Sequence, residues 1–362
     1  MNCEQPTHRN PFTVTIEPTL NCNLDCRYCY SLRGPRTTIP TDVAKRTIAE
    51  IADYAGSRGF NELDCVWLGG EPILAGIRFF KNIFRATRNL AVPVRHFVQT
   101  NGMMLDADFC RLFRDENIQV GISIDGPQEI HDAFRLSRDG SPTHGLVMTA
   151  IALLQKHQVG FGCVSVVTSA VLGHEREVYA FFRSLGLAFR INPVIPGKRG
   201  QSGPWQISPA AYGHALVKFF DLWIRPAHDH VDISPLDNYV AAVLHDEPTE
   251  CQHKLCCAGG TIGIGADGAV TICSRSAGSP LGRLGTSSMT EILASRSCVD
   301  QLRRSELLED CHACENWRIC HGGCSQNALA FGVDPNARDP FCPAYKAIFS
   351  RIRGALNSGA IR

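Results

Sequence analysis

The sequence predicts an α/β fold: a partial, TIM-like (β/α)6 barrel followed by a C-terminal cysteine-rich domain. Over the first two-thirds of the 362 residues, strand-like segments alternate with segments of helical periodicity. This alternation is typical of parallel strands joined by right-handed crossovers. Six strand segments can be counted. That is fewer than the eight of a complete barrel, so an open doubly wound sheet fits the count as well. Further along the chain, residues 251–342 hold ten of the 17 cysteines.

Strand and helix segments follow one another from residue 12 to residue 193. The expected strands occupy 12–18, 64–72, 94–102, 119–127, 159–168 and 188–193. The expected helices occupy 41–56, 76–90, 106–117, 143–158 and 174–186. Thr41 is expected to cap the first helix, with Gly56 just past its end. Most polar and glycine-rich motifs follow strand ends, and in parallel α/β folds that is the edge where ligands bind.

The composition divides the chain into three expected regions. A barrel domain is expected over 12–196, a connector with helices over 197–250, and a cysteine-rich domain over 251–349. Residues 193–209 are rich in Pro and Gly and show no apolar period, which indicates a connector or a lid. A helix is expected to follow over 210–224.

The bulk composition excludes several classes of protein. Hydrophobic residues make up 44% and charged residues 20% of the chain, as in ordinary globular proteins. The net charge of +1 gives no strong field that would attract nucleic acid or an anionic membrane. No stretch approaches the roughly 20 apolar residues that span a bilayer, and the first residues lack the pattern of a signal peptide. We therefore expect a cytoplasmic protein without a nucleic-acid or membrane partner.

Three cysteines follow the first expected strand with the spacing C-x3-C-x2-C. Cytoplasmic thiols stay reduced, so cysteines at such tight spacing indicate metal binding rather than disulfides. One interpretation of Cys22, Cys26 and Cys29 is a zinc site whose fourth ligand comes from elsewhere. The other is a [4Fe–4S] cluster held by three thiolates, which leaves one iron open for a substrate or cofactor.

The C-terminal cysteines are denser. They lie in "CQHKLCC", in "GAVTIC" and in "CHACENWRICHGGC", and a last one follows 17 residues later. At least eight thiols in this region imply two four-thiolate sites, and both zinc and iron–sulfur clusters suit such soft ligands.

The first motif, with an aromatic residue before its last cysteine, resembles that of the radical S-adenosylmethionine (SAM) superfamily. The resemblance implies that the amino and carboxylate groups of SAM chelate the open iron, and that the cluster cleaves SAM reductively to a 5′-deoxyadenosyl radical. In such enzymes the protein binds, orients and shields the cofactor. The implied SAM-binding residues are Tyr28, the "GGEP" turn of Gly69, Gly70, Glu71 and Pro72, then Ser123, Arg135 and Ile195, with Asn101 and Gly102 as weaker candidates.

The C-terminal run resembles a full SPASM domain of the twitch type, which carries two auxiliary [4Fe–4S] clusters. The resemblance assigns one cluster to Cys251, Cys257, Cys273 and Cys324, and the other to Cys311, Cys314, Cys320 and Cys342. Cys256 competes with Cys257 for one position. Of the remaining cysteines, Cys65, Cys110 and Cys163 are expected to be buried apolar groups, and Cys3 and Cys298 have no assignment.

The expected cofactors are thus three [4Fe–4S] clusters and SAM. Within the superfamily, the chain most resembles maturases of ribosomally synthesised peptides (RiPPs) and anaerobic sulfatase-maturating enzymes. In sulfatase maturases, an aspartate that acts as the general base directly follows the third ligand of the first auxiliary cluster. Here Ser274 and Arg275 follow Cys273, and neither has a pKa that suits a general base. We therefore expect oxidation or crosslinking of peptide side chains, with an electron donor such as flavodoxin or ferredoxin.

Two alternatives stay open: formylglycine formation on sulfatases, and a zinc-stabilised, non-catalytic binding protein. The catalytic base is not assigned. Asp125, His144, His253 and Asp267 are candidates for which structural roles are equally expected.

Overall fold

The computed structural model describes residues 11–31, 38–196, 202–225, 230–255, 257, 260–276, 280–295 and 304–361. Cys3, Cys256 and Cys298 lie outside the described residues, as does part of the expected connector.

One sheet organises the described chain, and its strands follow the order β10-β9-β8-β1-β2-β3-β4-β5-β6-β7. The strands are β1 (Phe12–Ile16), β2 (Leu63–Trp67), β3 (Val94–Thr100), β4 (Gln119–Ser123), β5 (Phe161–Val167), β6 (Phe189–Pro193), β7 (Ile233–Ser234), β8 (Thr261–Ile264), β9 (Ala269–Thr271) and β10 (Gly282–Arg283). Strands β1 to β7 are parallel and adjacent in chain order. A doubly wound sheet would reverse its order, so this succession confirms the partial barrel.

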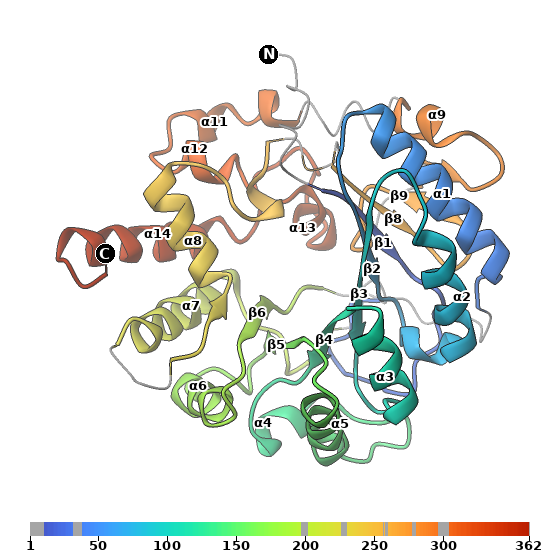
Figure 1. The fold of residues 1–362 in the computed structure, drawn as a ribbon. Coiled ribbons are helices and arrows are strands. Elements are labelled where there is room, and N and C mark those ends of the chain that lie inside the picture. Colours follow the sequence, from blue (N-terminus) through green and yellow to red (C-terminus); the bar gives the residue numbers. More distant parts are fainter. Residues whose placement is uncertain are drawn as a thin grey trace.

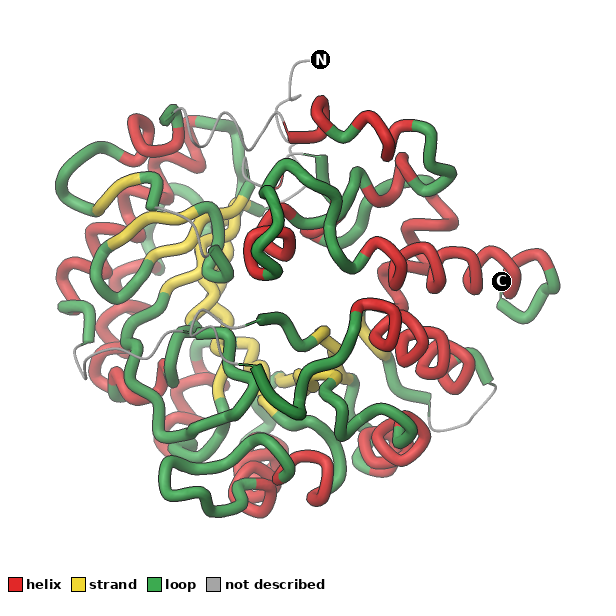
Figure 2. The backbone as a smooth tube through the Cα atoms, turned by 180° about the vertical axis from the view of Figure 1, so that it is seen from behind, coloured by secondary structure: helices red, strands yellow, loops and turns green. Residues whose placement is uncertain are grey.

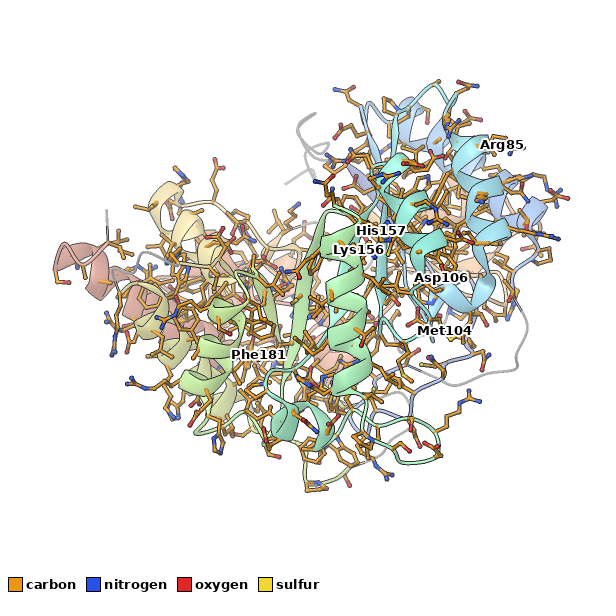
Figure 3. All side chains as sticks on the ribbon, turned by 60° about the horizontal axis from the view of Figure 1, so that its bottom comes forward. Arg85, Met104, Asp106, Lys156, His157 and Phe181 are labelled. Atoms are coloured by element: carbon orange, nitrogen blue, oxygen red, sulfur yellow. The ribbon has the colours of Figure 1, made fainter. Side chains whose placement is uncertain are left out.

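Helices cover the outer face of the curved sheet (Figure 1). They are α1 (Thr41–Ser57), α2 (Ile77–Thr87), α3 (Ala107–Asp115), α5 (His144–Lys156) and α6 (Glu175–Ser184). Figure 3 brings α3 and α5 forward, with the exposed Asp106 and Lys156 labelled. The Asp106 side chain accepts a hydrogen bond from Phe109 N at 2.9 Å and so caps α3. The expectation that Thr41 caps α1 was wrong, because that helix starts at Thr41 and its N-cap is Pro40, which makes no side-chain cap bond.

Burial alternates along the strands with a period of two. In β1, Phe12, Val14 and Ile16 are fully buried, whereas Thr13 and Thr15 are half-buried. The buried set belongs to the large core cluster shared with the helices. The other set therefore faces the inside of the barrel, which Figure 2 shows from behind.

The C-terminal part of the chain extends the sheet past β1. Strand β8 pairs with β1 in parallel, and β9 and β10 follow it antiparallel, an extension that the sequence did not predict. Helix α14 (Cys342–Asn357) packs along α7 (Pro209–Trp223). A Cβ on Gly213 would lie 2.7 Å from Ala344 Cα, so the close approach of these two helices requires glycine there. The remaining helical segments are η1 (Pro72–Ala75), α4 (Gln128–Asp132), α8 (Leu236–His245), η2 (Cys251–His253), α9 (Met289–Leu293), η4 (Arg304–Leu307), α11 (Glu309–His312), α12 (Trp317–Cys320) and α13 (Ser325–Ala330).

Candidate functional site

The loop that follows β1 carries Cys22, Cys26 and Cys29, all half-buried. Burial raises the pKa of the Cys22 thiol to about 11 and that of Cys26 to about 12. The charges of the three sulfurs also interact with one another, so the loop gathers them in one place. Thiolates are the form that binds metal, and binding would therefore release protons from these groups.

Hydrogen-bond donors surround these sulfurs. Leu24 N lies 3.4 Å from Cys22 Sγ, and Asn101 Nδ2 approaches the same sulfur at 3.9 Å. Arg135 Nη1 lies 3.8 Å from Cys26 Sγ, and its charge lowers the pKa of both thiols. Such donors stabilise anionic sulfur, so the loop fits a cluster held by three thiolates.

The "GGEP" turn packs directly on the cysteine loop. Gly70 N donates to Thr19 O at 3.0 Å, and Glu71 N donates to Asn21 O at 2.8 Å. A Cβ on Gly70 would lie only 2.2 Å from Asn21 O, and Gly69 has a φ of +120°. Both positions therefore require glycine, and the exposed backbone at this turn suits close approach by a ligand.

The Glu71 side chain points into the protein. Its buried carboxylate accepts hydrogen bonds from Thr100 Oγ1 at 2.7 Å, Asn101 N at 2.7 Å and Ile73 N at 3.2 Å. Burial raises the pKa of this carboxyl to about 7, against the opposing effect of the three donors. The Glu71 side chain thus holds together the turn, the start of η1 at Pro72 and the end of β3. As a SAM contact, Glu71 stays a prediction that concerns its backbone only.

A buried group of polar side chains fixes the other side of the cysteine loop. Tyr28 donates its hydroxyl hydrogen bond to Asp125 Oδ2, and Asp125 Oδ1 accepts from Val166 N at 3.1 Å. The guanidinium of Arg135 lies 5.5 Å from the centre of the Tyr28 ring, and its Nε lies 3.5 Å from Asp125 Oδ2. Asp125 therefore serves a structural and electrostatic role here, which leaves it a less suitable base.

His131 connects this group to Thr143, which directly precedes α5. Its Nδ1 accepts from Asp125 N at 3.3 Å, and its Nε2 lies 3.0 Å from Thr143 Oγ1. The Thr143 hydroxyl in turn donates to Arg135 O at 2.7 Å. Burial lowers the pKa of His131 to about 4, which keeps the ring neutral in this chain of bonds.

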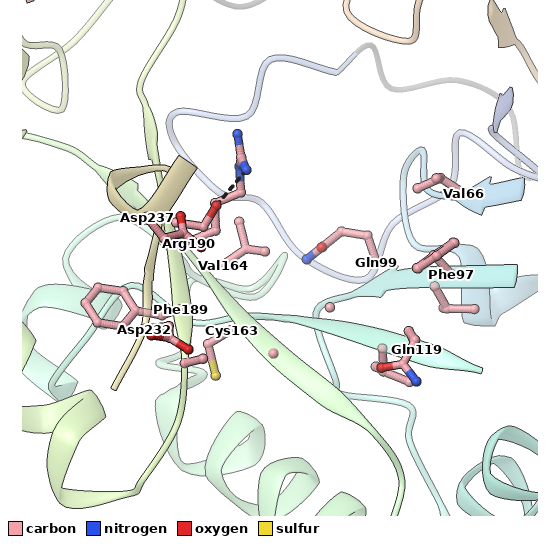
Figure 4. A pocket seen from close by; sticks show the side chains of 16 residues that line it. Val66, Phe97, Gln99, Gln119, Cys163, Val164, Phe189, Arg190, Asp232 and Asp237 are labelled. Atoms are coloured by element: carbon pink, nitrogen blue, oxygen red, sulfur yellow. Dashed lines mark hydrogen bonds between the residues drawn. The ribbon is translucent and has the colours of Figure 1, made fainter. Parts of the chain in front are cut away.

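Residues of strands β2 to β7 line a cavity at the barrel (Figure 4). Gln99, Gly121, Val164 and Arg190 are among its lining residues. Ser123 Oγ accepts from Gln99 Nε2 at 2.9 Å, and its contact with SAM stays a prediction. Arg190 pairs with Glu250 at 2.5 Å, a contact that the sequence did not suggest.

Of the other predicted SAM contacts, Ile195 is half-buried and packs against the core, and Gly102 N donates to Thr100 Oγ1 at 3.1 Å. These two residues, like the rest of the predicted set, stay predictions as ligand contacts.

The structure brings together the four thiols assigned to the first auxiliary cluster. The charges of Cys251, Cys273 and Cys324 all act on the Cys257 thiol, whose pKa burial raises to about 12. Asp339 fixes the backbone at Cys324, because its Oδ2 accepts from Cys324 N at 2.8 Å and from Asn327 Nδ2 at 2.8 Å. Asp339 is thus a positioning residue that spacing alone did not reveal.

The thiols assigned to the second auxiliary cluster line a single small cavity. They are Cys311, Cys314, Cys320 and Cys342. Within the described chain, no three His, Cys, Asp or Glu side chains converge tightly enough to hold one metal ion. Both thiol sets therefore stay predicted cluster ligands. The prediction that Cys65, Cys110 and Cys163 are buried is confirmed.

The remaining candidate bases are His253, Asp267 and His144, and each has structural contacts of its own. His253 is fully buried among Tyr239, Tyr345 and Phe349, and burial lowers its pKa to about 4. Asp267 pairs with Arg283 at 2.9 Å in the turn after β8.

His144 is half-buried at the start of α5, where its ring packs edge-on against His131. Each of these three side chains thus has a structural setting of its own.

Comparisons with known proteins agree with this arrangement. Residues 16–180 match the family model of the radical SAM superfamily, and residues 256–315 match that of an iron–sulfur cluster-binding (SPASM) domain. A serine-type anaerobic sulfatase-maturating enzyme of Bacteroides thetaiotaomicron is 26% identical over 94% of this chain and 89% of its own length.

Two kinds of solved structure share the fold. anSMEcpe with bound AdoMet and the Cp18Cys peptide has a TM-score of 0.85 at 24% identity, covering 97% of this chain and 99% of that one. Streptococcus suis SuiB bound to its precursor peptide SuiA has a TM-score of 0.68 at 16% identity, covering 92% and 76%. In the described part of the chain, no helix is both long and apolar enough to cross a membrane.

Proposed function

Because the chain carries a radical SAM domain followed by a SPASM domain, and is therefore an iron–sulfur-dependent enzyme, we propose that it oxidises side chains of a ribosomally synthesised peptide. The alternative of a non-catalytic, zinc-stabilised protein was wrong, since both domains belong to iron–sulfur enzymes. One observation carries the proposal. Ser274 and Arg275 follow Cys273, whereas sulfatase maturases have an aspartate that acts as the general base after this cysteine.

The proposed cofactors are SAM and three [4Fe–4S] clusters. Cys22, Cys26 and Cys29 would hold the first cluster, and the two sets of four thiols would hold the others. SAM would lie between the Gly69–Gly70 turn and Arg135, whose fork of donors suits a carboxylate. When bound, SAM and the first cluster together supply an oxidising carbon radical. The chain's own residues orient the cofactor, supply its countercharges and keep water from the site.

The surroundings of Arg275 support peptide oxidation other than formylglycine formation. Its guanidinium is committed to Cys324 Sγ at 3.7 Å and to Asn327 Oδ1 at 3.3 Å. Ser274, which holds the position of the expected aspartate, lines a cavity with Glu17 and Asp267. A hydroxyl cannot take a proton near neutral pH as a carboxylate can.

Sulfatase maturation is the second candidate. The likeness to a serine-type sulfatase-maturating enzyme extends over 94% of this chain, which favours a related substrate class. Both candidates share a peptide or protein substrate and an external electron donor such as flavodoxin or ferredoxin.

The deciding experiment offers the reconstituted enzyme two substrates in the presence of SAM and a reductant. One is the peptide encoded beside the enzyme's own gene, and the other is a peptide with a sulfatase Ser or Cys motif. We expect the first peptide to lose two hydrogens without gaining an aldehyde, as judged by mass and by failure to react with a hydrazide. Hydrazide-reactive product from the sulfatase peptide, with the first peptide unchanged, would establish the second candidate instead.

A further inference from the structure

Arg275 is a positive charge placed against the sulfurs of the first auxiliary set. It lies two residues after Cys273 in the loop that leaves β9. Its Nη2 is 3.7 Å from Cys324 Sγ, and its Nη1 is 3.3 Å from Asn327 Oδ1. Asn327 is itself fixed by Asp339 through a bond of 2.8 Å, so the guanidinium has a fixed position relative to Cys324.

Among the residues that the structure describes, Arg275 has no carboxylate partner. Within the described residues, no Asp or Glu oxygen lies within ion-pairing distance of its guanidinium. Its Nη2 instead lies 3.7 Å from Cys324 Sγ, and Cys273 stands two residues before it in the chain. A cluster held by Cys324 and Cys273 would therefore supply a countercharge to this arginine.

A fixed cation beside a cluster stabilises the form that carries one more electron. Net charge, hydrogen bonds to the sulfurs and burial are the factors that set the reduction potential of an iron–sulfur cluster. Arg275 supplies both a positive charge and an N–H donor to a sulfur. It does so in a half-buried position, where charges interact more strongly than in water. In sulfatase maturases this loop carries a negatively charged aspartate, whereas in this chain it carries the positively charged Arg275.

We propose that Arg275 raises the reduction potential of the auxiliary cluster held by Cys251, Cys257, Cys273 and Cys324. The proposal rests on the auxiliary clusters of the proposed function but not on its substrate. The second auxiliary set has a different environment, since the basic side chains acting on Cys342 are Arg338 and Lys346.

The test is a redox titration followed by electron paramagnetic resonance, without peptide. The background is the triple variant Cys22→Ala, Cys26→Ala, Cys29→Ala, which leaves only the auxiliary clusters to be observed. Arg275→Met should lower the midpoint potential of one cluster and leave the other unchanged, and Arg275→Lys should give an intermediate value. The control Arg283→Met removes the same charge from an exposed position and should change neither potential.

Unchanged potentials in Arg275→Met, or an equal shift of both clusters, would overturn the proposal. Iron content identifies a variant that fails to assemble the cluster. In that case Arg275→Gln, which keeps an N–H donor but loses the charge, takes the place of the Met variant, and an unchanged potential there is again a refutation. The expected shift, together with a wild-type enzyme that leaves the peptide encoded beside its gene unchanged, would refute the proposed substrate while leaving the role of Arg275 intact.

Discussion

The hydroxyl of Tyr28 donates a hydrogen bond to Asp125, and this bond ties the cysteine loop to the end of β4. The two residues are 97 positions apart in sequence. Arg135 completes the group by lying over the Tyr28 ring and beside Asp125. A tyrosine placed between two predicted cluster ligands thereby fixes the loop to the barrel.

Replacing Asp125 with Asn should strongly destabilise the protein. The change leaves the buried charge of Arg135 without its carboxylate, and breaking a buried pair in this way costs about 3–5 kcal/mol. Urea unfolding of the iron-free chain measures the loss. The matched control is Asp64→Asn, whose partner Arg95 is 49% exposed and which should therefore cost at most about 1 kcal/mol. Equal losses in the two variants would contradict the assigned role of Asp125.

Replacing Cys26 with Ala should remove the first cluster alone. Iron should fall from about twelve to about eight atoms per chain, because each cluster holds four, and cleavage of SAM to 5′-deoxyadenosine should stop. Cys110→Ala, at a buried thiol of α3, should keep the full iron content and cleave SAM. Cleavage that persists in Cys26→Ala would mean that the three-ligand site is misassigned.

Replacing Gly70 with Ala should disturb the same site without removing a ligand. The added Cβ would lie 2.2 Å from Asn21 O, so the cysteine loop or the turn must move. We expect at least a tenfold loss of SAM affinity, about 1.4 kcal/mol, measured by equilibrium binding. Gly145→Ala serves as control, since nothing lies within 4 Å of the added atom there. Unchanged affinity in Gly70→Ala would show that this backbone takes no part in binding.

Glu71 should make stability fall as pH rises towards neutral. Burial holds its pKa at about 7 in the fold, above the ordinary value of 4.5. The folded state therefore keeps a proton that the unfolded chain loses between these values, and stability declines with pH across this window. The total effect is roughly 3 kcal/mol, at about 1.36 kcal/mol per pKa unit.

Urea unfolding of the iron-free chain from pH 4.5 to 8 measures this slope, and Glu71→Gln should flatten it. The control Glu116→Gln, at an exposed pair with Arg88, should leave the slope unchanged. If the unfolding free energy of Glu71→Gln falls with pH as steeply as that of the wild type, another group causes the effect.

The sequence by itself determined the parts that depend on local pattern. The six strands and five helices of the barrel lie where their periodicity predicts, because each element repeats its apolar residues with its own spacing. The cysteine motifs also carry their own spacing, so the iron–sulfur class of enzyme followed from the chain alone.

Only the tertiary structure decided which distant groups meet. Asp339 reaches Cys324, Glu250 reaches Arg190 and Arg275 reaches the same Cys324, and none of these pairs has a signature in the sequence. The short strands β7 to β10 were missed because two to four residues are too few to show a period. Such contacts depend on how the sheet curves and extends past β1, and that is set by packing over the whole chain rather than by any local run of residues.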